Sequence, residues 1–273
     1  MREAKNTEIK LVVFDLDDTL LDSRQGISAR TSAAIRQVAQ KGIAIMLATG
    51  RMYASTVKFA QYLELAVPLI TYNGAMVKAF PSGELLFHQP IDPEAAAQVL
   101  ALCREQRWHI QTYIDDVLYV REINRYASLY ARITDTEPVA VGDRLYALQA
   151  APTKMLVIAE PDTVQQIKAY LAARLGNRLY IAESKPNFLE ITHPSVHKGA
   201  ALRWMAEQLK IDRHHIMAFG NGGNDIEMLR YAGWGIAVGN SPAEVKKAAR
   251  LVTDSHDEDG VAKILEKVNL HFD

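Results

Sequence analysis

The sequence of 273 residues has a single cysteine, Cys103, and no long apolar run. One cysteine cannot form an intramolecular disulfide, and it has no partner for a CxxC redox or metal site. The apolar runs are far shorter than the roughly 18 to 20 residues that span a bilayer, and the polar N-terminus lacks the apolar segment of a signal peptide. We therefore expect a cytoplasmic protein with no membrane partner.

Blocks of like charge are also missing. The 31 lysines and arginines nearly balance the 32 aspartates and glutamates, and both signs are scattered along the chain. This pattern argues against a nucleic-acid partner, because such surfaces depend on displacing counterions from phosphates. Hydrophobic residues make up 49% of the chain and charged residues 23%, so we expect an ordinary globular protein of one large or two modest domains.

Both ends of the chain alternate short apolar runs with helical patterns, which is typical of βα units on a parallel sheet. In the first part a helix is predicted over 28–41, with Ser28 as its N-cap and Gly42 after its end. The same alternation returns in the last part, where Ser241 and Glu244 predict a capping box at the start of a helix.

The middle of the chain has a different pattern, of two βαββ units. The first begins at LLFHQ (85–89) and the second at KMLVIA (154–159), which suggests one sheet with both helices on one face. The predicted fold class is α/β, with a Rossmann-like parallel core and an inserted α+β domain. The core comprises residues 1–82 and 191–273, and the insertion comprises residues 83–190.

Two carboxylates follow the first apolar run. Asp15 and Asp17 are two residues apart, so on an extended segment their side chains project to the same side. The carboxyl end of a strand is where open α/β sheets bind ligands. Taken alone, the Asp-x-Asp tripeptide is more typical of a loop with a capping carboxylate.

Two further segments suit a phosphate group. Thr49 and Gly50 offer a hydroxyl and an unobstructed backbone amide just before a predicted helix. Lys198 lies at a helix start, where a cation gains nothing from the helix dipole and is more plausibly directed at an anion. Ordinary helix capping and a solvated lysine are the alternatives.

A glycine-rich run, GNGGND, joins an apolar strand to a helix at 220–225. Its glycines allow the backbone to approach a ligand closely, and Asn221, Asn224 and Asp225 carry the hard oxygen atoms that Mg²⁺ accepts. A plain turn is the alternative. Four such segments on one parallel sheet are expected to converge at the same edge.

These segments resemble the four motifs of the haloacid dehalogenase (HAD) superfamily, in the order DLDDTL, ATGR, HKGAAL and GNGGNDIEML. TYNGA (71–75) and NFLEITHPSVHKG (187–199) resemble signatures of its Cof-like phosphatases with a type IIB cap. The resemblance covers nearly the whole chain. It implies a HAD core with an inserted cap and Mg²⁺-dependent hydrolysis of small phosphomonoesters, such as sugar phosphates or cofactor-like phosphates.

The resemblance also implies a role for each residue. Asp15 is the expected nucleophile, which becomes an aspartyl-phosphate, and Asp17 is the expected general acid and base. The residues expected to bind phosphate are Thr49, Gly50, Lys198 and Asn224. The residues expected at the metal are Asp15, Asp17, Asn221 and Asp225. Arg51 and Asn73 are candidates for substrate contacts, with surface or structural roles as the alternatives.

One position departs from the family pattern. Asn221 stands where the family usually has an aspartate that binds Mg²⁺ directly, so weaker metal binding is expected. A natural variant that works at high Mg²⁺, an engineered substitution and a protein with little turnover all remain open. The alternative function is a catalytically impaired protein that binds a phosphorylated metabolite. The expected partner is in either case a small phosphorylated molecule, bound by a monomer or homodimer.

Overall fold

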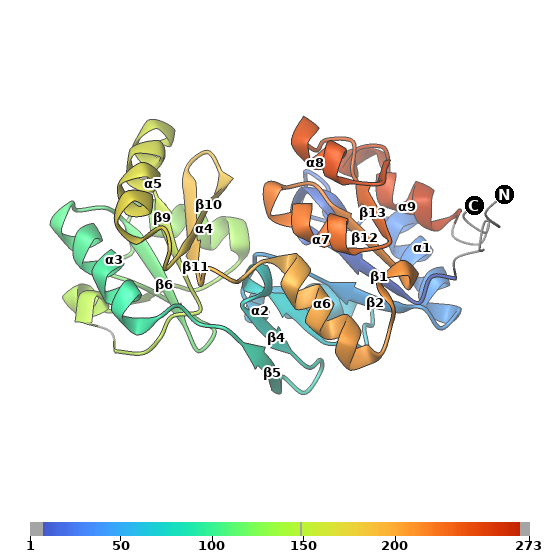
Figure 1. Ribbon diagram of the computed structural model, residues 1–273, viewed down its shortest axis with the longest axis horizontal. Helices are drawn as coiled ribbons and strands as arrows, with labels where there is room; N and C mark the ends of the chain where they lie inside the picture. The colour runs from blue at the N-terminus through green and yellow to red at the C-terminus, as the bar shows by residue number, and fades with distance from the viewer. Residues whose placement is uncertain (1–7, 148, 268–273) are drawn as a thin grey trace. The chain divides into compact units, whose positions relative to one another are not determined.

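The computed structural model describes residues 8–147 and 149–267 (Figure 1). Two compact units make up this part of the chain. The first contains residues 8–50, 56–86 and 197–267, and the second contains residues 51–55 and 87–196. Within the described residues no helix combines the length and the apolar character needed to cross a bilayer.

The first unit is built on a five-stranded parallel sheet with the order β14-β13-β12-β1-β2. Its strands are β1 (Leu11–Phe14), β2 (Ala44–Leu47), β12 (Ile216–Gly220), β13 (Trp234–Ala237) and β14 (Leu251–Val252). The central strand β1 is wholly buried, and Phe14 stacks on Phe219 of β12 with ring centroids 5.2 Å apart. The predicted α/β class with a parallel core sheet is confirmed.

Helices pack around this sheet, with α1 against α9 and α6 against α7. They are α1 (Ala29–Gln40), α6 (Lys198–Leu209), α7 (Ile226–Tyr231), α8 (Ala243–Ala248) and α9 (Gly260–Leu265), and α2 (Tyr53–Tyr62) begins in the second unit and ends in the first. As predicted, the Ser28 side chain accepts a hydrogen bond from the Thr31 amide at the start of α1, and Gly42 follows its end with φ +81°.

The capping box predicted at Ser241 is wrong. Helix α8 starts later than expected, so Pro242 occupies its N-cap position and no side chain caps it. The Ser241 hydroxyl instead donates to the carbonyl oxygen of Gly220, 3.5 Å away. The tertiary hydrogen bond replaces the local one that the sequence favoured.

A three-stranded sheet has the order β3-β4-β5, and the place of β5 in it differs from the prediction. Its strands are β3 (Leu69–Thr71), β4 (Met76–Lys78) and β5 (Leu85–His88). Strand β5 was expected to open the first βαββ unit of the insertion. The amide of Ala79 donates to the carbonyl of Glu84 at 2.8 Å, and this short connection folds β5 back as a hairpin onto β4.

The second unit has a six-stranded sheet with the order β10-β11-β9-β6-β7-β8. Its strands are β6 (Ile110–Ile114), β7 (Val117–Val120), β8 (Val139–Ala140), β9 (Lys154–Ile158), β10 (Tyr180–Lys185) and β11 (Phe188–Thr192). Its helices are α3 (Pro93–Glu105), α4 (Arg125–Thr134) and α5 (Pro161–Leu175). Asp115 and Asp116 both have positive φ and form the tight turn between β6 and β7.

The core of the second unit contains apolar residues from α3, α5 and the sheet, including Val99, Cys103, Val157 and Leu171. Cys103 has no exposed surface, and burial raises the pKa of its thiol to about 12. Because the thiolate is the reactive form, the native thiol should be inert at neutral pH.

We predict that Cys103 reacts with Ellman's reagent only after unfolding. The absorbance change should be absent in the native chain and should reach one thiol per chain in denaturant. Reaction of the native protein at the rate of the denatured one would show that this core is open.

Candidate active site

Three of the predicted segments follow adjacent parallel strands of the first unit. Asp15 comes directly after β1, Thr49 follows β2, and Asn221 follows β12. The Asp15 amide donates to the Phe219 carbonyl at 3.0 Å, which continues the pairing of β1 with β12 past the strand end. These side chains therefore gather at the carboxyl edge of the sheet.

A buried lysine joins two buried carboxylates at this edge. Lys198 Nζ donates to Asp15 Oδ1 at 2.5 Å and to Asp225 Oδ1 at 2.7 Å. Lys198 and Asp225 have no exposed surface, and Asp15 is only 5% exposed. Lys198 is the first residue of α6, so its position at a helix start, noted from the sequence, serves to hold these two carboxylates.

Burial and repulsion control the charge of this group. Burial, together with the charge of Asp225, raises the pKa of Asp15 to about 7, against the lowering effect of Lys198. Burial acts to lower the pKa of Lys198, but the charges of Asp15 and Asp225 hold it above its ordinary value. The lysine is therefore a cation, and it offsets only part of the neighbouring negative charge.

Asp225 also shapes the glycine-rich loop. Its second oxygen, Oδ2, accepts hydrogen bonds from the amides of Asn221 and Gly222, each 2.9 Å away. A Cβ atom on Gly220 would lie 2.6 Å from the Asp225 side chain, so the strand end can approach this carboxylate only as glycine. Both Asp225 oxygens are thus held by donors of the protein.

Asn73 connects two of the segments predicted to bind phosphate. Asn224 Nδ2 donates to Asn73 Oδ1 at 2.9 Å, and the Asn73 amide donates to the Thr49 carbonyl at 2.9 Å. A Cβ atom on Gly50 would lie 2.9 Å from Asn73 Oδ1. The 7% exposed Asn73 side chain therefore lies between the loops that follow β2 and β12.

Asp17 lies in a tight turn over Leu16–Leu20, where its backbone is extended and Asp18 has φ +57°. The charge of Asp17 contributes to the raised pKa of Asp15. Within this turn Thr19 Oγ1 donates to Asn221 Oδ1 at 3.0 Å. Thr19 was not among the predicted site residues, although its hydroxyl in the DLDDTL segment was the available signal.

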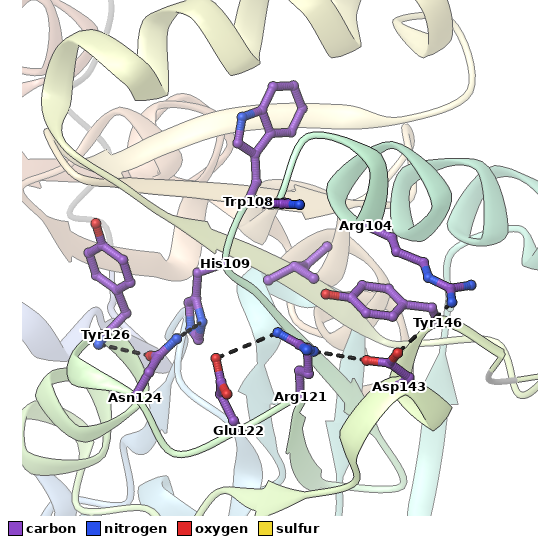
Figure 2. A pocket seen from close by; sticks show the side chains of 11 residues that line it. Arg104, Trp108, His109, Arg121, Glu122, Asn124, Tyr126, Asp143 and Tyr146 are labelled. Atoms are coloured by element: carbon purple, nitrogen blue, oxygen red, sulfur yellow. Dashed lines mark hydrogen bonds and ion pairs between the residues drawn. The ribbon is translucent and has the colours of Figure 1, made fainter.

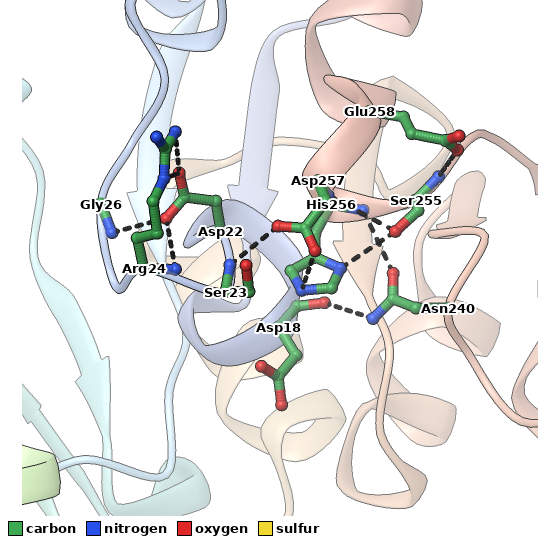
Figure 3. Close-up of polar contacts among 10 residues, drawn as sticks. All are labelled: Asp18, Asp22, Ser23, Arg24, Gly26, Asn240, Ser255, His256, Asp257 and Glu258. Atoms are coloured by element: carbon green, nitrogen blue, oxygen red, sulfur yellow. Dashed lines mark hydrogen bonds and ion pairs between the residues drawn. The ribbon is translucent and has the colours of Figure 1, made fainter.

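The C-terminal segment fixes this turn from outside (Figure 3). Asn240 Nδ2 donates to the Asp18 carbonyl at 2.8 Å, and Asn240 Oδ1 accepts from the His256 amide at 3.2 Å. The Ser23 amide donates to Asp257 Oδ1 at 2.8 Å. Asn240 is 222 positions from Asp18, so no local pattern could have revealed this contact.

Arg51 is assigned to the second unit and is 6% exposed. The other candidate residues all belong to the first unit: Asp15, Asp17, Thr49, Gly50, Asn73, Lys198, Asn221, Asn224 and Asp225.

The oxygen donors of the site suit a hard cation. The part of the chain that the structure describes has no cluster of three or more His, Cys, Asp and Glu side chains placed to hold a metal. A magnesium ion would therefore rely on one or two carboxylates, an amide oxygen, main-chain oxygens, water and the substrate phosphate, as magnesium commonly does. Asp15, Asp17 and Asn221 carry oxygen atoms of these kinds, and Lys198 pairs with the carboxylates of Asp15 and Asp225.

Comparisons with known proteins agree over nearly the full chain. A family model described as haloacid dehalogenase-like hydrolase matches residues 12–265. The chain is 30% identical over 269 residues to a 5-amino-6-(5-phospho-D-ribitylamino)uracil phosphatase of Bacillus subtilis, with 96% of this chain and 98% of that protein covered. It is 31% identical over 239 residues to an HMP-PP phosphatase of Cronobacter sakazakii, with 85% of each covered.

A solved structure shares the fold. A haloacid dehalogenase-like hydrolase from Bacteroides thetaiotaomicron matches with a TM-score of 0.88 and 28% sequence identity, covering 96% of this chain and all of that one.

Replacing Lys198 by methionine should leave two buried carboxylates without their cation. We expect Lys198→Met to lower the free energy of unfolding by about 3 kcal/mol at about pH 8 in the presence of a chelator. The loss should shrink toward about pH 5, because Asp15, whose pKa burial raises to about 7, takes up a proton there and no longer repels Asp225. Urea unfolding of the parent chain and of Lys198→Met at both pH values measures this loss of stability.

Lys247→Met, which replaces an exposed lysine of the same unit, is the matched control and should change stability little. An equal loss at both pH values for Lys198→Met would contradict the electrostatic account.

Proposed function

Because the chain belongs to the family of haloacid dehalogenase-like hydrolases, we propose that it is a phosphatase that hydrolyses phosphomonoesters of small metabolites through an aspartyl-phosphate on Asp15. The resemblance to the haloacid dehalogenase superfamily drawn from the sequence motifs is confirmed. The observation that carries the proposal is the buried Asp15 at the end of β1, hydrogen bonded to Lys198. Relatives named as phosphatases of phosphorylated metabolites support it.

In the first step, an Asp15 oxygen attacks the phosphorus of the ester. A bond forms between Asp15 and phosphorus, the bond from phosphorus to the alcohol oxygen breaks, and Asp17 gives its proton to the departing alcohol. In the second step, Asp17 takes a proton from water, which attacks the same phosphorus. Inorganic phosphate leaves, and Asp15 is free again.

The remaining residues position the phosphoryl group. Lys198 lies within hydrogen-bond distance of the nucleophile, so its cation is placed to neutralise oxygens of a phosphate that Asp15 attacks. We assign Thr49, Gly50 and Asn224 to the same oxygens, with Asn73 holding their loops together. Arg51 and Asn73 remain proposed substrate contacts.

We assign Mg²⁺ to Asp15, the main-chain carbonyl of Asp17 and Asn221 Oδ1. Bound there, the ion would neutralise charge on the phosphoryl group and keep Asp15 ionised. Asp225 would act on the ion indirectly, because its two oxygens already bind Lys198 and the amides of the 221–222 loop.

The alternative proposal, an impaired enzyme that still binds phosphorylated metabolites, rests on Asn221. This side chain has no formal charge, and its Oδ1 already accepts a hydrogen bond from Thr19. Both features weaken its hold on a divalent cation. The intact pair of Asp15 and Asp17 favours the enzyme.

The relatives differ in the substrates that their names print, so family membership leaves the substrate open. We propose a small phosphorylated metabolite. A cytoplasmic location and a monomeric or homodimeric state stay predictions.

Asp15→Asn should abolish turnover. Phosphate release from a panel of sugar phosphates, nucleotides, flavin mononucleotide and pyridoxal phosphate should fall by about 10³-fold or more, because an amide cannot serve as the nucleophile. Asp162→Asn, at an exposed position on α5, is the control and should keep full activity. Equal turnover by Asp15→Asn and the parent chain would show that Asp15 is not the nucleophile.

Asn221→Asp should strengthen magnesium binding, since it adds one charge beside Asp15. We expect the Mg²⁺ concentration that gives half-maximal phosphate release to fall by about tenfold. Asn177→Asp, at an exposed position, supplies the same charge away from the site and should change nothing.

Activity in the aspartate variant alone would identify the parent chain as a disabled form. Metabolite binding without hydrolysis in both chains would favour the binding protein.

A further inference from the structure

The second unit contains a pocket of about 480 Å³ that the proposed chemistry does not use (Figure 2). It lies between the end of α3, the start of β6, the end of β7 and the 142–147 turn. This is the end of the β6–β7 hairpin opposite the Asp115–Asp116 turn. All of its lining residues belong to the second unit.

Three arginines line the pocket, and two of them are partly neutralised. Arg121 Nε donates to Asp143 Oδ1 at 2.9 Å, and its guanidinium lies 3.7 Å from Glu122. Arg104 approaches Asp143 at 3.9 Å. Three cations against two carboxylates leave an excess positive charge at the pocket.

Arg107 is the third arginine of the pocket, and it accounts for the excess positive charge. It is exposed, and within residues 8–147 and 149–267 its side chain makes no hydrogen bond or ion pair. An arginine presents a planar fork of donors that matches phosphate and carboxylate oxygens, so a free arginine beside two others suits an anion.

The rest of the lining is aromatic or neutral. Rings of Trp108, Tyr126 and Tyr146 stand around the space, with Arg104 5.7 Å from the Tyr146 ring centre. His109 is partly buried, and its ring is tilted by 35° against that of Tyr126, with centroids 5.4 Å apart. Asn124 Nδ2 lies 3.1 Å from its Nδ1. Burial lowers the pKa of His109 to about 4, so it adds no charge at neutral pH.

We propose that this pocket binds a small molecule in which a planar ring is joined to a phosphate, of the size of a nucleoside monophosphate. Its volume lies in the range of small-molecule sites. The arginines would take the phosphate, and the aromatic rings would stack on the planar part. Asp143 and Glu122 would remain to accept hydrogen bonds from amino or hydroxyl groups.

Tryptophan fluorescence tests the proposal on the full chain, because Trp108 lines the pocket. Titration with AMP in the presence of a chelator should give a saturable change that disappears in Trp108→Phe. Adenosine alone and inorganic phosphate alone should each bind about tenfold more weakly than AMP, since each supplies only half of the contacts.

Arg107→Gln should weaken AMP binding by about tenfold or more, through loss of its charge-assisted hydrogen bonds. Arg132→Gln, at an exposed arginine of α4 outside the pocket, is the matched control and should bind as the parent does. No saturable change with AMP, a change that persists in Trp108→Phe, or equal affinities of the two arginine variants would each overturn the proposal. None of these results depends on phosphatase activity.

Discussion

The site depends on one buried ionic contact, in which Lys198 bridges Asp15 and Asp225. Charged groups with almost no exposed surface are costly unless they are paired, so this arrangement forces the three segments that carry them to meet. One lysine cannot neutralise both carboxylates and the nearby Asp17. The resulting excess of negative charge suits the site to a cation. Burial, together with the charge of Asp225, raises the pKa of Asp15.

The supporting contacts extend from this centre through the polar side chains of the loops. Asp225 holds the glycine-rich loop, which places Asn221 against Thr19 of the turn after β1. On the other side Asn224 holds Asn73, whose amide is bound to the Thr49 carbonyl. The side chains of Asp15, Asn221, Asn224 and Asp225 are thus each held by a residue of another segment, which is the pre-organisation that electrostatic catalysis requires.

Local patterns were enough to predict the parallel core, the start of α1 and the convergence of the chemical segments, because strand ends on one sheet share an edge. They failed at β5, where the short 79–84 connection folds the strand back onto β4. They also failed where contacts distant in sequence decided the outcome. Ser241 donates to Gly220 instead of capping a helix, and Asn240 donates to Asp18 across 222 positions. Val99 and Cys103, four positions apart on α3, are both buried, as the local period of a helix favours.

The most direct measurement is a crystal structure of the chain with magnesium and beryllium fluoride, a mimic of the phosphoryl group. The account predicts beryllium bonded to a carboxylate oxygen of Asp15, with its fluorines contacted by Lys198 and by the loops carrying Thr49 and Asn224. Beryllium bonded to another carboxylate, with no contact between Lys198 and the fluorines, would contradict it.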